Sequence, residues 1–232
     1  MNRFWGKVIK PIFLKEQPKV IVEIGAFRGE NTVKILRYCR RNHAKLHVID
    51  PLPQFNVRQM KRCGKQHFTL IRALSLKALP RIPNPDVLLI DGDHNWYTVY
   101  HELKCVERSA KKTGKFPIVM LHDTEWPYGR RDSYYLPETI PPPYRKPYAK
   151  KGIVLGKSRL VNTGGLNYQF NNALYENGEK NGVLTAIEDF LKETSFPITF
   201  HRVASHNGLG ILVHKDELKD RWIQEVLKKS RL

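Results

Sequence analysis

Short apolar runs alternate with segments of helical spacing along the first half of the chain. The runs predict five strands, over residues 20–24, 45–50, 67–71, 86–91 and 116–121. Between them, apolar residues recur at helical spacing after Asn31, over 54–66 and up to about Ala110. Strands that are apolar throughout are typical of a sheet buried on both faces. The alternation therefore predicts a parallel sheet with helices on both sides.

The two ends of the chain add helices and a hairpin. Residues 1–16 place apolar side chains at helical spacing with lysines between them, which predicts an N-terminal helix packed on the domain. A basic amphipathic segment in peripheral contact with a membrane surface is the alternative. A helix is expected over 183–194 and another from about Asp216. Strands over 198–203 and 209–213 are close enough to form an antiparallel hairpin at the sheet edge.

Residues 125–181 interrupt this pattern. Seven of the ten tyrosines fall here, together with Pro141, Pro142 and Pro143, and basic residues outnumber acidic ones. A long aperiodic segment is usually functional or disordered, and its aromatic content argues against disorder. We expect a substrate-binding insertion or lid within a single domain spanning 1–232. A structural arm, or one that forms a homo-oligomer, is the alternative.

The charge of the chain points to an anionic partner. Lysine and arginine number 40 against 22 acidic residues, a formal charge of +18. A phosphorylated or carboxylated substrate, an acidic membrane surface and nucleic acid all fit, as does a solvated basic surface with no partner. Three widely spaced cysteines indicate reduced thiols. Lysines interrupt the N-terminus too often for a secretory segment, and no apolar run approaches the ~18 residues of a spanning helix. The expected location is cytoplasmic.

Residues 20–32 combine a buried strand, a glycine-bearing turn and a helix start. Gly25 and Gly29 permit backbone angles and close approaches that a side chain would block. Such a unit presents backbone N–H groups and a helix N-terminus to a nucleotide-like ligand. Its spacing differs from the Gly-x-Gly-x-x-Gly dinucleotide pattern. An ordinary strand–helix connection therefore stays open at this point.

Polar residues end the other strands as well. Asp50 lies 21 residues after Gly29, near the offset at which an acidic side chain reaches a ribose. Asp91 precedes Asp93 and His94, and the fifth strand runs into His122 and Asp123. Each could be a helix cap or turn residue. Ligands of parallel sheets sit outside the carboxyl ends of strands, so four polar ends together favour a site.

This order of motifs resembles a class I S-adenosylmethionine-dependent methyltransferase. The resemblance rests on Glu-x-Gly-x-x-x-Gly at 23–29, the strand-end Asp50, Asp-Gly-Asp-His at 91–94 and His-Asp-Thr at 122–124. It is similar within that class to the bacterial group of macrocin-type sugar O-methyltransferases and cephalosporin-hydroxylase-like proteins. The match covers about 19–124 and resumes over about 182–214. It implies an α/β, Rossmann-like, seven-stranded, mostly parallel sheet with an antiparallel edge hairpin and a long insertion after the fifth strand.

The resemblance also implies roles for individual residues. Residues that would bind S-adenosylmethionine are Glu23, Gly25, Ala26 and Gly29 on the methionine side, Asp50 at the ribose, Ala73 and Ser75 beside the adenine, and Asp91. In the macrocin-like group an aspartate at the position of Asp91 ligates a divalent cation and a histidine at the position of His94 is the general base. The remaining cation ligands would be His122 and Asp123. The imidazole departs from the family's acidic pair, which leaves open whether a cation is required and whether it is magnesium or a transition metal.

We therefore expect an O-methyltransferase acting on a hydroxyl of a sugar, glycan or natural product that carries an anionic group. His94 would remove the hydroxyl proton with Asp91 as its catalytic partner, although His94 could instead cap the helix that follows it. An RNA methyltransferase is the second reading. Nucleic acid is not favoured, because no RNA-binding motif is recognisable and the charge is spread along the chain. A non-catalytic binding protein on the same fold is the third.

Overall fold

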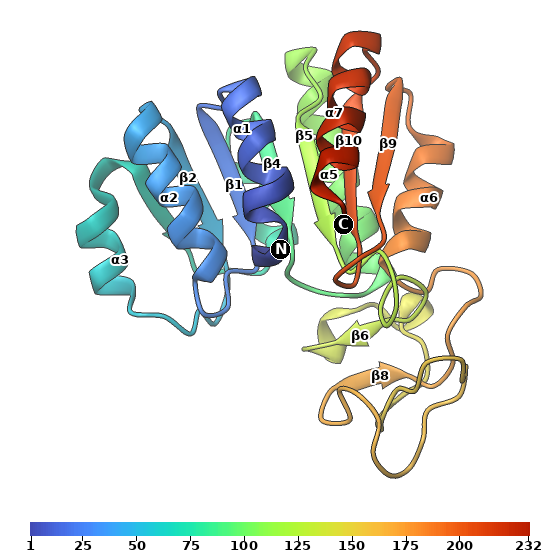
Figure 1. Cartoon of the computed structure of the whole chain (residues 1–232). Helices are drawn as coiled ribbons and strands as arrows, with labels where there is room; N and C mark the ends of the chain where they lie inside the picture. The colour runs from blue at the N-terminus through green and yellow to red at the C-terminus, as the bar shows by residue number, and fades with distance from the viewer.

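The computed structural model describes residues 1–232 and contains a central seven-stranded sheet (Figure 1). Its strand order is β3-β2-β1-β4-β5-β10-β9. Strands β1 to β5 run parallel, and β10 runs antiparallel to both β5 and β9. The bounds are β1 Val20–Ile24, β2 Lys45–Ile49, β3 Phe68–Ile71, β4 Val87–Ile90, β5 Ile118–His122, β9 Ile198–Val203 and β10 Leu209–His214. The predicted fold class is confirmed, including the reversed hairpin at the edge.

Helices connect these strands, and all but the short helix at Ser75–Ala78 lie where the apolar spacing predicted them. They are α1 Lys10–Glu16, α2 Glu30–Asn42, α3 Val57–Gly64, α4 Ser75–Ala78, α5 Trp96–Thr113, α6 Val183–Glu193 and α7 Glu217–Ser230. Residues before α1 form a 3₁₀ turn, η1 Asn2–Phe4, and a π-helical turn, η2 Trp5–Ile9. The helix expected over 54–66 is shorter, because Asn56 caps it by accepting a hydrogen bond from the Gln59 N–H. None of the helices is both long and apolar enough to cross a membrane.

Two apolar cores cover the two faces of the sheet. On one face, Ile21 of β1 and Leu89 of β4 pack with α1, α2 and α7. On the other face, Val22 and Leu88 from the same strands pack with α5 and α6. Successive side chains of a strand point to opposite faces, so a strand between two helix layers must be apolar at every position. This is why β1 and β4 read as continuous apolar runs.

The insertion after β5 forms a small sheet of its own. Strands β6 Ser133–Tyr134, β8 Asn171–Ala173 and β7 Tyr148–Lys150 pair antiparallel in that order. Beneath them, Tyr128, Ile153 and Leu160 make a small apolar core. Figure 1 shows this sheet below the carboxyl ends of the parallel strands. The insertion therefore lies at the edge of the main sheet where a ligand is expected.

Candidate active site

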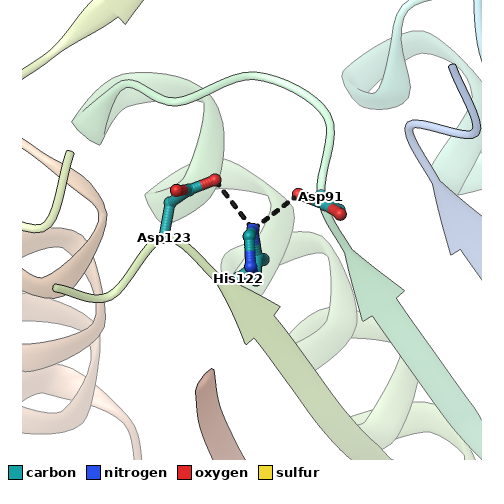
Figure 2. A group of neighbouring side chains, drawn as sticks. All are labelled: Asp91, His122 and Asp123. Carbon is teal, nitrogen blue, oxygen red and sulfur yellow. Dashed lines mark hydrogen bonds and ion pairs between the residues drawn. The ribbon is translucent and has the colours of Figure 1, made fainter. Parts of the chain in front are cut away.

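The carboxyl ends of β4 and β5 bring together Asp91, His122 and Asp123 (Figure 2). The Nδ1 atom of His122 lies 3.1 Å from Asp91 Oδ1 and 2.9 Å from Asp123 Oδ2. On its other side, His122 Nε2 lies 3.1 Å from the backbone carbonyl oxygen of His206. The three side chains are partly or fully buried. Parallel neighbouring strands thus gather two carboxylates around one imidazole.

His94 joins this cluster from the loop between β4 and α5. Its Nε2 lies 2.9 Å from Asp123 Oδ2 and 4.0 Å from Asp91 Oδ1. Its ring stacks on Tyr128 of the insertion, with ring centroids 5.2 Å apart, and lies 5.8 Å from Tyr135. The N-cap of α5 is Asn95, whose Oδ1 accepts from the Thr98 N–H, so His94 does not cap this helix.

The backbone of Asp123 adopts a left-handed conformation, with φ of +58°. This region is uncommon for residues other than glycine, and aspartate is among those that tolerate it best. The conformation turns the chain sharply after β5, and the Asp123 carboxylate faces both His122 and His94. Backbone strain of this kind persists only where surrounding contacts fix it, and it gathers at functional sites.

The charges in the cluster stabilise one another. Burial alone would lower the pKa of His122, but the Asp91 and Asp123 carboxylates raise it to about 9. Burial also opposes charge on His94, whereas Tyr135 and Asp123 raise the pKa of that imidazole well above its usual range. Despite burial, His94 and His122 hold the pKa of Asp123 well below its usual range. The other oxygen of Asp91, Oδ2, accepts from the amino group of Met1 at 2.8 Å.

The glycine turn packs directly against this cluster. Gly25 has φ of +80°, and a Cβ atom there would lie 2.2 Å from the Asp91 carbonyl oxygen. Asp50 stabilises the turn, since its Oδ2 accepts from the N–H groups of Ala26 and Phe27 at 2.8 and 2.9 Å. Its Oδ1 accepts from the Leu52 N–H. The sequence-predicted residues of β1 and β2 therefore lie together, with Asp50 holding the turn in place.

Glu23 supports the start of the helix after the turn. The carboxylate accepts from Asn31 Nδ2 at 2.8 Å and from the Thr32 hydroxyl at 2.6 Å. Burial raises the pKa of Glu23 to about 7, although both hydrogen bonds oppose the rise. The start of α2 itself has Gly29 as its N-cap, and no side chain caps it. Its first N–H groups are thus left without side-chain acceptors.

Ala73 and Ser75 follow β3, and Ser75 begins α4. Their neighbour Glu102 was not expected from the sequence. This α5 residue is fully buried, and neither carboxylate oxygen has a hydrogen-bond partner. Burial raises the pKa of Glu102 to about 8, with the nearby Asp93 adding to the rise and Ser75 opposing it. The Oδ1 atom of Asp93 is buried without a partner as well. Helical periodicity could have identified Glu102, because it places this charged residue on the buried face of α5.

Asp132 was also not expected from the sequence, and it joins the insertion to the loop that carries His94. Its Oδ1 accepts from the N–H groups of Trp96 and Gly182 at 2.7 and 2.6 Å, and its Oδ2 accepts from the Tyr134 hydroxyl at 2.8 Å. Next to it, the Ser133 N–H donates to the His94 carbonyl oxygen. These bonds fix the insertion against the loop that carries His94. No sequence pattern marked Asp132, since two of its partners, Trp96 and Gly182, lie 36 and 50 residues from it along the chain.

Comparisons with known proteins identify the fold and a domain within it. Residues 22–124 match the family described as a methyltransferase domain. No curated protein matches the chain. The S-adenosylhomocysteine-bound methyltransferase PaMTH1 of Podospora anserina is similar, with 14% identity, a TM-score of 0.51 and coverage of 88% of this chain and 75% of that chain. A protein assigned as an O-methyltransferase from Klebsiella pneumoniae has 13% identity, a TM-score of 0.50 and coverage of 91% and 80%.

At these identities the two structures show a shared fold, and the family match identifies a methyltransferase domain within the chain. The matched residues run from β1 to the end of β5 and contain the glycine turn, Asp50 and the cluster at Asp91, His94, His122 and Asp123. Residues 22–124 thus carry a methyltransferase domain, and the chain has the fold of an S-adenosylhomocysteine-bound methyltransferase.

Proposed function

We propose that the chain transfers the methyl group of S-adenosylmethionine to a hydroxyl of an anionic sugar, glycan or natural product. The observation that carries this proposal is the position of His94. Its Nε2 lies 2.9 Å from Asp123 and 4.0 Å from Asp91, the residue against which the glycine turn packs. Its ring stacks on Tyr128 of the insertion. A hydroxyl needs a base before it becomes a good nucleophile, and an oriented imidazole can supply one.

Several features fit the cofactor. The uncapped N–H groups at the start of α2 suit the carboxylate of its methionine part, close to Gly25, Ala26 and Gly29. The unpartnered oxygens of Asp93 and Glu102, near Ser75, suit the donor groups of an adenine. Asp50 already accepts three hydrogen bonds, so its Oδ1 has capacity for one ribose hydroxyl.

The chain's own residues would then carry out the proton transfer. Because the Asp123 carboxylate favours the charged form of His94, this imidazole acts as a base only after it has lost a proton. In that neutral form its Nε2–H donates to Asp123, and Nδ1 is the atom that would accept the proton of the substrate hydroxyl. Methyl transfer is an in-line displacement, so the hydroxyl must be held between Nδ1 and the methyl carbon. Tyr128 fixes the plane of the His94 ring by stacking on it. Asp91, His122 and Asp123 would hold a divalent cation, which lowers the pKa of a bound hydroxyl.

The insertion offers groups that suit an anionic, ring-shaped acceptor. Tyr135 is 54% exposed although it adjoins His94, and it packs edge-on against Phe170. Lys150, at the end of β7, and the adjacent Lys151 are exposed in the same insertion. Exposed aromatic rings can cover the face of a sugar, and basic side chains pair with phosphate or carboxylate. We therefore place acceptor binding between the catalytic cluster and the insertion.

A direct test is an acceptor screen with methyl-labelled S-adenosylmethionine. The panel pairs phosphorylated or carboxylated sugars and phenols with their neutral counterparts, and includes a mixed RNA sample. We expect label in an anionic hydroxyl acceptor, at higher kcat/KM than in its neutral counterpart. Label in RNA alone would favour an RNA methyltransferase. Folded protein that does not bind the cofactor would leave only a binding role.

A further inference from the structure

The candidate cation ligands at Asp91, His122 and Asp123 form a mixed donor set. Two are carboxylate oxygens and the third is an imidazole nitrogen. Magnesium strongly prefers oxygen ligands, whereas imidazole suits first-row transition metals such as Fe²⁺, Co²⁺, Ni²⁺ and Zn²⁺. The chemistry of the donors therefore bears on which ion the site takes, and this inference rests on the cation suggested under the proposed function.

The orientation of His122 makes one particular nitrogen available. Its Nε2 lies 3.1 Å from the His206 carbonyl oxygen, which can only accept a hydrogen bond, so Nε2 carries a hydrogen. Its Nδ1 faces both carboxylates and is therefore the nitrogen that would bind a metal, once its proton is released. Histidines that ligate metals commonly donate from the second ring nitrogen to a backbone carbonyl in this way.

The spacing of the donor atoms fits one ion. Nδ1 lies 3.1 Å from Asp91 Oδ1 and 2.9 Å from Asp123 Oδ2. Two ligand atoms bound at right angles, each ~2.1 Å from a metal, are ~3.0 Å apart. The left-handed backbone at Asp123 already directs its carboxylate to this position. The amino group of Met1 contacts Oδ2 of Asp91, so it does not occupy Oδ1, the oxygen that faces His122.

We propose that this site selects a first-row transition dication over Mg²⁺, and that His122 Nδ1 is the ligand that decides the selection. The imidazole stands where an oxygen ligand would favour Mg²⁺. Replacing His122 by aspartate should therefore shift the preference toward Mg²⁺ without removing the site. Replacing it by asparagine supplies a neutral amide oxygen in place of the nitrogen.

The test measures metal binding by the full chain after removal of metals with EDTA, with no acceptor present. Titration calorimetry with Co²⁺, Zn²⁺ and Mg²⁺ gives the affinity ratios, and pulsed electron paramagnetic resonance of bound Cu²⁺ detects coupling to imidazole nitrogen. We expect the wild type to bind Co²⁺ and Zn²⁺ in preference to Mg²⁺ and to show nitrogen coupling. His122→Asp and His122→Asn should lose the coupling that arises from His122. Their Co²⁺/Mg²⁺ preference should fall by a factor comparable to the roughly 10–100-fold by which changes beside a metal ligand weaken metal affinity.

His201→Gln is the matched control. His201 is a buried histidine whose Nε2 lies 2.9 Å from Asp220, outside the candidate active site, so its loss should change neither the affinity ratio nor the coupling. Circular dichroism checks that each variant is folded. Two His122 variants are used so that the test can still be made if one of them does not fold. Equal affinity of the wild type for Mg²⁺ and Co²⁺, or a Co²⁺/Mg²⁺ affinity ratio that is unchanged in a folded His122 variant, would overturn the inference. Neither result depends on methyl transfer, so the proposed function is tested separately.

Discussion

Glu102 tests how burial affects the ionisation of a carboxyl group beside the predicted adenine site. The side chain is fully buried on α5, neither oxygen has a hydrogen-bond partner, and burial raises its pKa to about 8 from an ordinary 4.5. At neutral pH the carboxyl is therefore protonated in the folded chain and ionised in the unfolded chain. Glutamine has nearly the same shape and cannot ionise, so Glu102→Gln removes this difference.

The sign and the size follow from proton linkage. The folded state binds an extra proton between pH 4.5 and about 8, so the free energy of unfolding of the wild type falls as pH rises through that window. The slope is about 1.4 kcal/mol per pH unit, and the whole loss is on the order of 5 kcal/mol. Glu102→Gln should match the wild type below pH 4.5 and be more stable by roughly 3 kcal/mol at pH 7.

Urea unfolding at several pH values between 4.5 and 8, followed by circular dichroism, measures this difference. The matched control is Glu107→Gln on the same helix. Burial would raise the pKa of Glu107, but its bonds to Lys104 and Thr194 lower it. That carboxylate stabilises the fold above its unfolded pKa, so Glu107→Gln should be less stable than the wild type at pH 7 and approach it in acid. A stability difference between Glu102→Gln and the wild type that does not change with pH would refute the reasoning.

Two further substitutions test the turn and the insertion. Asp50→Ala leaves the N–H groups of Ala26 and Phe27 without their acceptor, so we expect a loss of ~1–3 kcal/mol in stability and weaker S-adenosylmethionine binding. Urea unfolding and calorimetry measure these, and unchanged cofactor affinity would contradict the role. Asp132→Ala removes the acceptor shared by Trp96 and Gly182, so the insertion should exchange amide hydrogens faster and the KM for the acceptor should rise. Hydrogen exchange over residues 125–181 that matches the wild type would argue against this link.

The main sheet could be predicted because its strands are unusually constrained. Strands such as β1 and β4 lie between two helix layers, so the sequence must be apolar at every position there. The small sheet of the insertion could not be predicted in the same way. Strands β6, β7 and β8 are two or three residues long, which is too short to show a period of two.

The candidate site was predictable where its residues end strands. His94, Asp91, His122 and Asp123 could be expected together, because parallel strands place their carboxyl ends at one edge. The contacts that hold them depend on long-range packing. The bond from His122 to the His206 carbonyl links positions 84 residues apart, and no local pattern reports it.

The most direct test of the proposed mechanism compares methyl transfer by the wild type, His94→Gln and the control His201→Gln. Cofactor affinity is measured on the same samples by calorimetry. If His94 is the general base, His94→Gln loses roughly 10²–10⁴-fold in kcat while its Kd for S-adenosylmethionine stays close to that of the wild type and of His201→Gln. Full turnover by a folded His94→Gln variant would contradict the proposed mechanism.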